Sequence, residues 1–529
     1  MVTPSRHRSL FADFGIVFLL VIGGGLIWIY QHAGRTATII AAIGAVVIGI
    51  TVYVVVEAHK GGTKGHRMNR AQISKEMGEL RLHLAKHVLP GIDTKKVSPD
   101  RLGLLIGKDI QTARGIWSSI EDSTLVVGPP RSGKTASIVI PYIVSYPGSV
   151  AATSTRPEIV VQTATQRLEL GPCFSFAPQS PDISVVDGVE PLRWSPVKGC
   201  EEPLVAIVRA GALVASGSGL GSSVSNSDFW AGSASAIMRC YLHAAAIGGK
   251  TISDVVQWSH DPTSNIPIDI LSKSGLDSAE IWAAELAKAS ADPKMAANVW
   301  AGVRRSLDAL ADPRVLKACS PPPGSSFDVD NFLREQSTLY LWGDASSQLS
   351  VAPLLACLLA SITDTAKHRA SAMKNGRLQP PLGLILDEVA NIAPLPNMPG
   401  LLSESGGVNI STVVILQSLA QARHRWGDAQ ASSMWDAATI KLILPGLSQA
   451  DDLGNISRLA GEVPIEVESH SAGSGGTSTS TSQMYRPKWS AQEIRSLPDG
   501  HALVFYRRLD PIELRLIPYW DRQKKTQKK

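Results

Sequence analysis

Gly128-Pro-Pro-Arg-Ser-Gly-Lys-Thr135 is a complete phosphate-binding loop of the pattern G-x-x-x-x-G-K-[ST]. The preceding stretch, Ser123–Val127, is short, apolar and β-branched, as a buried strand should be, and residues 136–142 can continue a helix. A loop between a strand and a helix turns its backbone N–H groups toward phosphates, and the helix N-terminus adds partial positive charge. A chance Gly/Pro turn would not explain this order, so the stretch predicts an α/β fold that binds ATP.

The loop also predicts roles for single side chains. Lys134 is expected to reach the β- and γ-phosphates, and the hydroxyl of Thr135 is expected to bind Mg²⁺. The predicted nucleotide-binding residues are Gly128, Arg131, Ser132, Gly133, Lys134 and Thr135.

A further predicted strand, which ends in acidic residues, supports this site. Residues 382–388 read Leu-Gly-Leu-Ile-Leu-Asp-Glu, an apolar run that ends in two carboxylates. We expect Asp387 to hold Mg²⁺ through water and Glu388 to act on the attacking water. An ordinary strand that ends in an acidic turn has the same pattern, but the upstream phosphate loop favours the catalytic interpretation.

The strand run Ser411–Leu416 ends at Gln417, whose amide can sense the γ-phosphate because ligands of open α/β sheets gather at the carboxyl ends of strands. The predicted catalytic residues are therefore Lys134, Glu388 and Gln417. Other strand candidates alternate with helical patterns, which indicates a mostly parallel sheet. These candidates are residues 149–153, 173–176, 337–342, 440–444 and 502–506.

The phosphate loop and the acidic motif lie far apart in the sequence, with 253 positions from Lys134 to Asp387. Helical patterns fill much of this interval, so we predict an inserted all-α domain at 195–325. It divides a P-loop nucleotide-binding domain into 61–194 and 326–529. Residues 469–482 are rich in Ser, Gly and Thr and predict a flexible loop.

Two uncharged runs stand near the N-terminus, Phe14–Tyr30 with 17 residues and Thr36–Val56 with 21. Each can span about 30 Å of hydrocarbon, the first with flanking residues included, so residues 1–60 predict a transmembrane hairpin. Only Arg35 lies in the short loop, whereas basic residues flank both outer ends; this bias predicts a two-pass protein of the plasma membrane with both termini in the cytoplasm. A cleavable signal peptide is the alternative, and it fits poorly because a second span follows.

Composition adds little. The net charge of +5 does not by itself indicate nucleic acid. The five cysteines are widely spaced without a C-x-x-C pair, which is typical of small apolar residues in a reducing compartment.

Taken together, these features resemble the type IV coupling proteins, the membrane-anchored hexameric DNA-pump ATPases of bacterial conjugation and type IV secretion. The resemblance covers nearly the whole chain. Besides the hairpin and the phosphate loop, it rests on Ile140-Pro141, Tyr146-Pro-Gly-Ser-Val150, Arg193-Trp-Ser-Pro196, Asp228-Phe-Trp230, Leu386-Asp-Glu388, Gln417-Ser-Leu-Ala-Gln421 and Arg486-Pro-Lys-Trp-Ser-Ala-Gln-Glu-Ile-Arg-Ser-Leu-Pro498.

The resemblance implies an α/β P-loop ATPase core that is RecA-like, with ATP and Mg²⁺ as cofactors. It also implies a homo-hexamer at the inner membrane that recruits relaxase-bound single-stranded DNA, or double-stranded DNA, and translocates it to a type IV secretion channel. The implied partners are relaxase and relaxosome proteins and the channel proteins. Two alternatives stay open: a coupling ATPase for protein effectors only, and a catalytically silent scaffold, which the intact Lys134, Thr135, Asp387 and Glu388 weaken.

Two positions depart from the family pattern. Where many members carry an Asp-Pro-Lys or Thr-Lys-Pro element, this chain has Thr153-Ser-Thr-Arg-Pro157. Where many place an arginine before the Gln strand, it has Ser405-Gly-Gly407. An arginine that acts across a subunit boundary, if the chain has one, must therefore come from elsewhere. The candidates are Arg131, Arg156, Arg304, Arg305 and Arg423. We expect Arg156 before Arg423, because both follow strands at the carboxyl edge of the sheet; the alternative is that both are surface or structural arginines.

Overall fold

The computed structural model describes residues 75–89, 93–217, 227–291, 293–343, 348–473 and 476–526. The chain divides into two compact units, a larger one of Met68–Gly461 with Trp489–Lys529 and a smaller one of Met1–Arg67 with Glu462–Lys488. The predicted transmembrane hairpin at 1–60 lies outside the described residues and stays a prediction.

The larger unit is built on one sheet, which has twelve strands in the described residues, in the order β2-β1-β14-β13-β10-β3-β9-β8-β4-β7-β5-β6. The eight strands from β10 to β6 run parallel to one another. The four strands from β2 to β13 form an antiparallel edge, and β13 also pairs antiparallel with β10. The mostly parallel sheet predicted from the sequence is confirmed. The strands are β1 (Gly103–Asp109), β2 (Gly115–Ser119), β3 (Thr124–Val127), β4 (Ser149–Ser154), β5 (Cys173–Phe176), β6 (Val189–Pro191), β7 (Thr338–Trp342), β8 (Leu382–Leu386), β9 (Ile410–Leu416), β10 (Ile440–Ile443), β13 (His501–Tyr506) and β14 (Ile512–Leu516).

Side chains of the central strands alternate between two hydrophobic cores. Val126 and Ile385 belong to the core that includes Tyr142 on one face of the sheet. Their neighbours Leu125 and Leu384 belong to the core on the other face. A parallel sheet covered on both faces needs such continuous apolar strands, which is why the sequence pattern revealed them.

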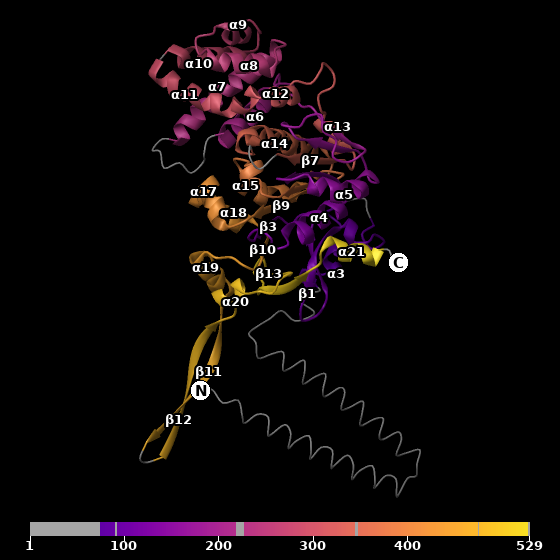
Figure 1. The fold of residues 1–529 in the computed structure, drawn as a ribbon, viewed down its shortest axis with the longest axis vertical. Helices are drawn as coiled ribbons and strands as arrows, with labels where there is room; N and C mark the ends of the chain where they lie inside the picture. The colour runs from indigo at the N-terminus through magenta and orange to yellow at the C-terminus, as the bar shows by residue number, and fades with distance from the viewer. Residues whose placement is uncertain are drawn as a thin grey trace. The chain divides into compact units, whose positions relative to one another are not determined.

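Helices cover both faces of the sheet and frame its edges (Figure 1). Helices α4 and α5 cover one face of the sheet. On the other face, α6 (Pro203–Gly217) packs along α14. The helices outside the 203–319 region are α3 (Glu79–Leu84), α4 (Ile140–Ser145), α5 (Glu158–Leu168), α13 (Val329–Arg334), α14 (Gln348–Ala372), α15 (Val389–Ile392), α16 (Met398–Glu404), α17 (Leu419–Trp426), α18 (Asp428–Ala437), α19 (Ala450–Ala460), α20 (Ala491–Arg495) and α21 (Tyr519–Thr526).

One helix, α14, is long and apolar enough to cross a membrane by length and composition, and it is the single such helix among the described residues. Its apolar window is 72% buried inside the larger unit. It is therefore the core helix of the fold, and it carries no argument about the membrane.

Between Pro191 and Val329 the described residues form helices and no strand. Figure 1 shows α7–α11 gathered at one end of the larger unit, beyond α6 and α14. This agrees with the helical content predicted for 195–325, while a separate domain with those boundaries stays a prediction, because the contacts place the segment in the larger unit. The helices are α6 (Pro203–Gly217), α7 (Ser227–Ile247), α8 (Ile252–His260), α9 (Ile266–Ser272), α10 (Asp277–Ala291), α11 (Pro293–Leu307) and α12 (Pro313–Cys319).

The described part of the smaller unit is a β-hairpin of β11 (Glu462–Gly473) and β12 (Gly476–Pro487). Twelve residue pairs join the two strands in an uninterrupted antiparallel register. The prediction of a flexible loop at 469–482 was wrong. Low complexity misled here because Thr is a good strand former, and three threonines alternate with serines in β12.

Candidate nucleotide-binding site

The phosphate loop begins where β3 ends. The backbone N–H of Gly128 donates to the carbonyl of Leu416 at the end of β9, over 3.1 Å. A Cβ on Gly128 would lie 2.7 Å from the side chain of Leu444, so close packing requires glycine there. Gly133 has a φ of +83°, which a side chain disfavours. The structure thus explains why the motif has glycine at both positions.

Lys134 is buried inside the loop. Its Nζ donates to the carbonyls of Gly128 and Pro129, over 2.7 and 2.6 Å. Burial lowers the pKa of Lys134, and the charges of Asp387 and Glu388 oppose that effect. The ammonium therefore stays on the loop, where the phosphates of a nucleotide could replace the two carbonyls as its partners.

The helix predicted after the loop is present, but it begins as a wide π turn at Thr135–Val139 and becomes α-helical at Ile140. Pro141 lies in the first turn of α4 and has no backbone N–H to donate to the residue four positions earlier. The wider turn before Pro141 is consistent with that missing hydrogen bond.

Asp387 follows β8 and is 93% buried, with 7% of its surface exposed. Burial and the neighbouring Glu388 raise the pKa of Asp387 to about 7, although Lys134 and a hydrogen bond from Thr135 act in the opposite direction. Its Oδ1 has no hydrogen-bond partner in the described residues. An orphaned carboxylate oxygen beside a threonine hydroxyl fits a Mg²⁺ ion, which prefers oxygen ligands.

Glu388 and Gln417 meet at the same edge of the sheet. Gln417 Nε2 donates to Glu388 Oε1 over 3.1 Å. Glu388 has a left-handed backbone, with a φ of +50°, directly before α15. Because β9 lies between β3 and β8, three neighbouring strand ends carry the loop, the acidic pair and the amide. The structure therefore brings Lys134, Thr135, Asp387, Glu388 and Gln417 together.

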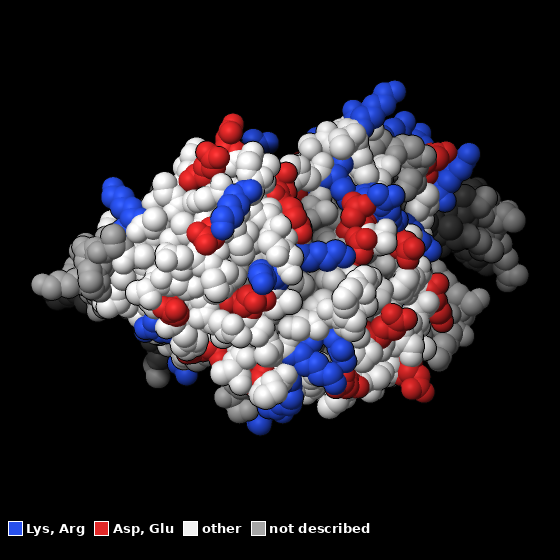
Figure 2. Space-filling model, turned by 90° about the horizontal axis from the view of Figure 1, so that it is seen from above, with Lys and Arg blue, Asp and Glu red and all other residues white. Residues whose placement is uncertain are grey.

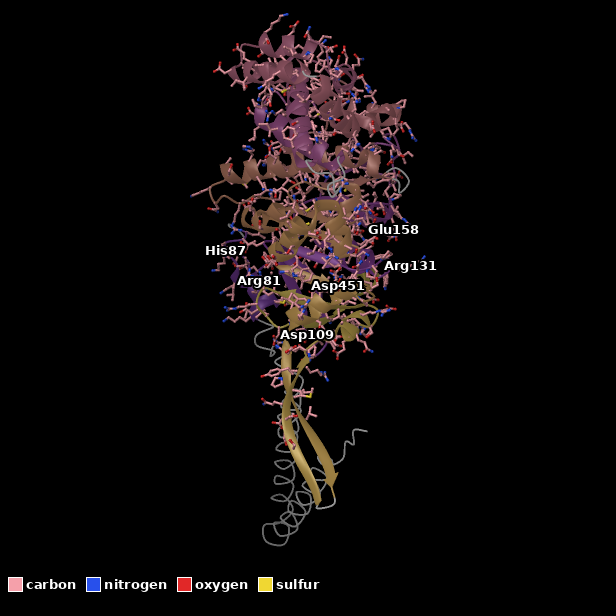
Figure 3. All side chains as sticks on the ribbon, turned by 90° about the vertical axis from the view of Figure 1, so that its left-hand side faces the viewer. Arg81, His87, Asp109, Arg131, Glu158 and Asp451 are labelled. Atoms are coloured by element: carbon pink, nitrogen blue, oxygen red, sulfur yellow. The ribbon has the colours of Figure 1, made fainter. Side chains whose placement is uncertain are left out.

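The remaining loop residues point elsewhere. Ser132 Oγ donates to the carbonyl of Pro129 over 2.8 Å and so closes the loop turn. Arg131 has a φ of +65° and lies exposed at the surface of the larger unit (Figure 3). These observations do not test the predicted roles of Ser132 and Arg131 in nucleotide binding, which stay predictions.

The two arginines considered for action across a subunit boundary differ in their surroundings. Arg423, on α17, makes a two-pronged ion pair with Asp452, over 2.9 and 3.1 Å. Arg156 is exposed, two residues beyond the end of β4, which neighbours β8. Its guanidinium makes no ion pair with any residue that the structure describes. Neither observation tests action across a subunit boundary, which stays a prediction for Arg156.

Two further residues at the site were not predicted. Thr153 pairs with Leu386 across β4 and β8, and its Oγ1 donates to the carbonyl of Asp387 over 2.8 Å. Gln421 accepts a hydrogen bond from the backbone N–H of Gln417. A polar residue at a buried strand end was the only available signal for Thr153, and strand register is needed to use it.

Comparisons with known proteins agree with this architecture. Residues 73–529 match the family model of type IV secretory system conjugative DNA transfer proteins. The conjugal transfer protein TraG of Agrobacterium fabrum (strain C58 / ATCC 33970) is 24% identical over 186 residues, which are 34% of this chain and 28% of that protein. The protein VirD4 of Rhizobium rhizogenes is 22% identical over 411 residues, 75% of this chain and 58% of that protein. The chain thus spans less than two thirds of the length of both relatives.

Solved structures of a bacterial conjugative coupling protein, TrwB, have the same fold. Its unbound form aligns with a TM-score of 0.54 at 14% identity and covers 79% of this chain and 88% of that one. Its complex with ADP and Mg²⁺ aligns with a TM-score of 0.54 at 15% identity, over 75% and 86%. The P-loop core with a large, mostly parallel sheet is therefore shared.

Proposed function

The chain belongs to the family of type IV secretory system conjugative DNA transfer proteins, and from this premise we propose that it is a coupling ATPase, which uses ATP to recruit DNA to a type IV secretion channel and to translocate it. The observation that carries the ATPase proposal is the Gln417–Glu388 hydrogen bond beside the buried, partly unpartnered carboxylate of Asp387. A scaffold without catalysis would have no use for this costly arrangement.

The side chains divide the chemistry among them. Lys134 neutralises charge on the phosphates once its ammonium leaves the loop carbonyls. Thr135 and Asp387 would hold Mg²⁺, which supplies charge stabilisation at the reacting phosphate. Glu388 takes the proton of the attacking water, and Gln417 holds the Glu388 carboxylate in place. TrwB has been solved with ADP and Mg²⁺, which supports the assignment of both to this site.

The larger assembly is also part of the proposal. Residues 1–60 form a two-pass hairpin in the plasma membrane, both termini are cytoplasmic, and the chain assembles as a homo-hexamer. The helices of 195–325 form an inserted domain. The cargo is relaxase-bound single-stranded DNA, or double-stranded DNA, and the partners are relaxosome and secretion channel proteins. The description of the family, conjugative DNA transfer of the type IV secretory system, supports DNA as the cargo.

A second candidate function is the transport of protein effectors alone. One observation favours it: Figure 2 views the larger unit from the end that carries α7–α11, and there Lys and Arg are interspersed with Asp and Glu. A dedicated DNA surface would be more uniformly basic. The helical end would then dock a protein instead.

Transfer of a marked plasmid tests the proposal. Cells that carry Lys134→Ala should lose transfer, whereas the matched control Lys374→Ala, at an exposed lysine, should keep it. ATP hydrolysis by the purified protein should rise with single-stranded DNA, and the increase should shrink as salt is added. Hydrolysis that ignores DNA but responds to an effector protein would favour the second candidate, and full transfer by Lys134→Ala would refute the site.

A further inference from the structure

We propose that Gln421 is a positioning residue for the nucleotide site, which fixes the backbone of Gln417 so that the Gln417 amide meets Glu388. The inference rests on the proposed ATPase function. The Gln421 side chain accepts from the main chain of Gln417, and the side chain of Gln417 in turn donates to Glu388.

The turn between β9 and α17 is closed by two reciprocal hydrogen bonds. The backbone N–H of Gln421 donates to Ser418 Oγ over 3.1 Å, which caps the helix. In the other direction, the backbone N–H of Gln417 donates to Gln421 Oε1 over 3.0 Å. The pair resembles a capping box in which the returning side chain reaches one residue further back, to a residue outside the helix.

The strand geometry explains why Gln417 needs this acceptor. β9 ends at Leu416, whose carbonyl accepts the N–H of Gly128 in the phosphate loop. On the other side, β8 already ends at Leu386, opposite Val414. The N–H of Gln417 therefore lies beyond the ladder, and Gln421 supplies the acceptor that a neighbouring strand would otherwise provide.

The position of the Gln417 backbone affects Glu388 through one further hydrogen bond. With its backbone held, Gln417 directs Nε2 to Glu388 Oε1 over 3.1 Å. A hydrogen bond of this length weakens steeply when its geometry changes, so a main chain that rotates at Gln417 releases Glu388. Helix α17, which carries Gln421, is itself held in place. Trp426 Nε1 donates to the carbonyl of Leu395 over 2.8 Å, and Arg423 pairs with Asp452.

A merely structural role would be helix capping, but Ser418 already supplies the side-chain cap of α17. The Gln421 side chain instead serves a residue before the helix, which carries the amide that contacts Glu388. Loss of the Gln421 acceptor should therefore affect the catalytic rate far more than stability.

Two substitutions of nearly equal shape separate these roles. Gln421→Met keeps the length of the side chain and removes the acceptor, whereas Gln421→Glu keeps an acceptor oxygen. In the full-length protein we expect Gln421→Met to lower kcat for ATP by about ten- to a hundredfold with little change in KM, since small misplacements near the reacting atoms cost rates of this order. Gln421→Glu should retain most of the rate, and the exposed control Gln492→Met should be unchanged.

A double-mutant cycle with Gln417→Ala identifies the path of action. If Gln421 acts through Gln417, Gln421→Met adds no further loss in the Gln417→Ala background. An equal loss in both backgrounds, or an undiminished kcat in Gln421→Met, would overturn the proposal.

Hydrogen exchange of the nucleotide-free protein supplies a readout without catalysis. The amide of Gln417 should exchange faster in Gln421→Met than in wild type or Gln421→Glu, while the amides of α14 keep their rates. Unchanged exchange at Gln417 would overturn the positioning role. If exchange changes as expected but the wild type hydrolyses no ATP with or without DNA, the proposed function fails and the hydrogen-bonded turn stands.

Discussion

The carboxylate of Glu388 has two roles that a change of one atom can separate: it contacts Gln417, and it is the proposed base. Its Oε1 accepts from Gln417 and would still do so as the amide oxygen of glutamine. Glu388→Gln therefore keeps the contact and removes the base, and we expect ATP to bind while hydrolysis falls by about 10²- to 10⁴-fold. Nucleotide binding and single-turnover hydrolysis measure the two effects, with the exposed Glu169→Gln as control. Hydrolysis at the wild-type rate would remove Glu388 from the chemistry.

Asp387 makes stability depend on pH in the absence of Mg²⁺ and nucleotide. Burial and Glu388 raise its pKa to about 7 in the folded protein, against about 3.9 in an unfolded chain. Between pH 4 and 7 the unfolded chain loses this proton and the folded protein keeps it, so the contribution to stability is full below pH 4 and is lost as the pH rises to 7.

Thermal unfolding in a chelator measures this effect. Asp387→Asn, which cannot ionise, should be more stable than wild type at pH 8, by roughly 4 kcal/mol at most, and the difference should shrink toward pH 4. A difference that does not change between pH 4 and pH 8 would contradict the raised pKa.

The site residues could be predicted to different degrees for a physical reason. Lys134 and Asp387 belong to motifs whose spacing along the chain is fixed by local geometry, so the sequence alone could predict that they lie together. Thr153 acts through the carbonyl of Asp387, beyond the end of another strand, and Gln421 acts through the N–H of Gln417, just beyond the end of β9. Their contacts depend on strand register and on where each strand ends, which the sequence pattern does not specify to one residue.

At the scale of elements, the strands also differ in how well the sequence predicted them. β3, β8 and β9 are apolar on both faces and were predicted because both faces are buried. β1 contains Gly103 and Gly107, where a Cβ would collide with the backbone at Ser118 and Arg515, and close approach rather than strand propensity selects these residues. Of the four strands of the antiparallel edge, only β13 was therefore predicted, as the strand candidate 502–506.

Arg167 joins three elements and gives a prediction at this scale. This fully buried residue of α5 donates to the carbonyls of Tyr146 and Gly148 and to Thr338 Oγ1, each over 2.7 Å. Arg167→Met would leave these acceptors without a partner, and we expect the free energy of unfolding to fall by about 3 kcal/mol. Denaturation by urea measures it, and the exposed Arg305→Met should change little. Equal stability of the two variants would show that the hydrogen bonds of Arg167 are not needed.

At the scale of the whole molecule, the proposed hexamer calls for a residue that supplies positive charge across the subunit boundary. Such an arginine is worth about 10³-fold or more in rate where it operates. The resemblance implies an arginine in many family members near the segment Ser405–Gly407, which has none here. A Cβ on Gly406 would meet the backbone of Glu121, so no larger side chain fits. Arg423 is held by Asp452, while Arg156 is exposed at the edge of the sheet that carries the site. We therefore expect Arg156 to reach a neighbouring subunit.

Mixed assemblies test this expectation because a residue that acts in a neighbour can be complemented. Arg156→Ala subunits have an intact phosphate loop, and Lys134→Ala subunits have an intact Arg156, so each variant alone should be nearly inactive. In a mixture, those boundaries that join an intact loop to an intact arginine should regain ATP hydrolysis. Arg423→Ala subunits in place of Arg156→Ala serve as the matched comparison. Full activity of Arg156→Ala alone would exclude Arg156, and inactivity without recovery on mixing would place its action within its own subunit.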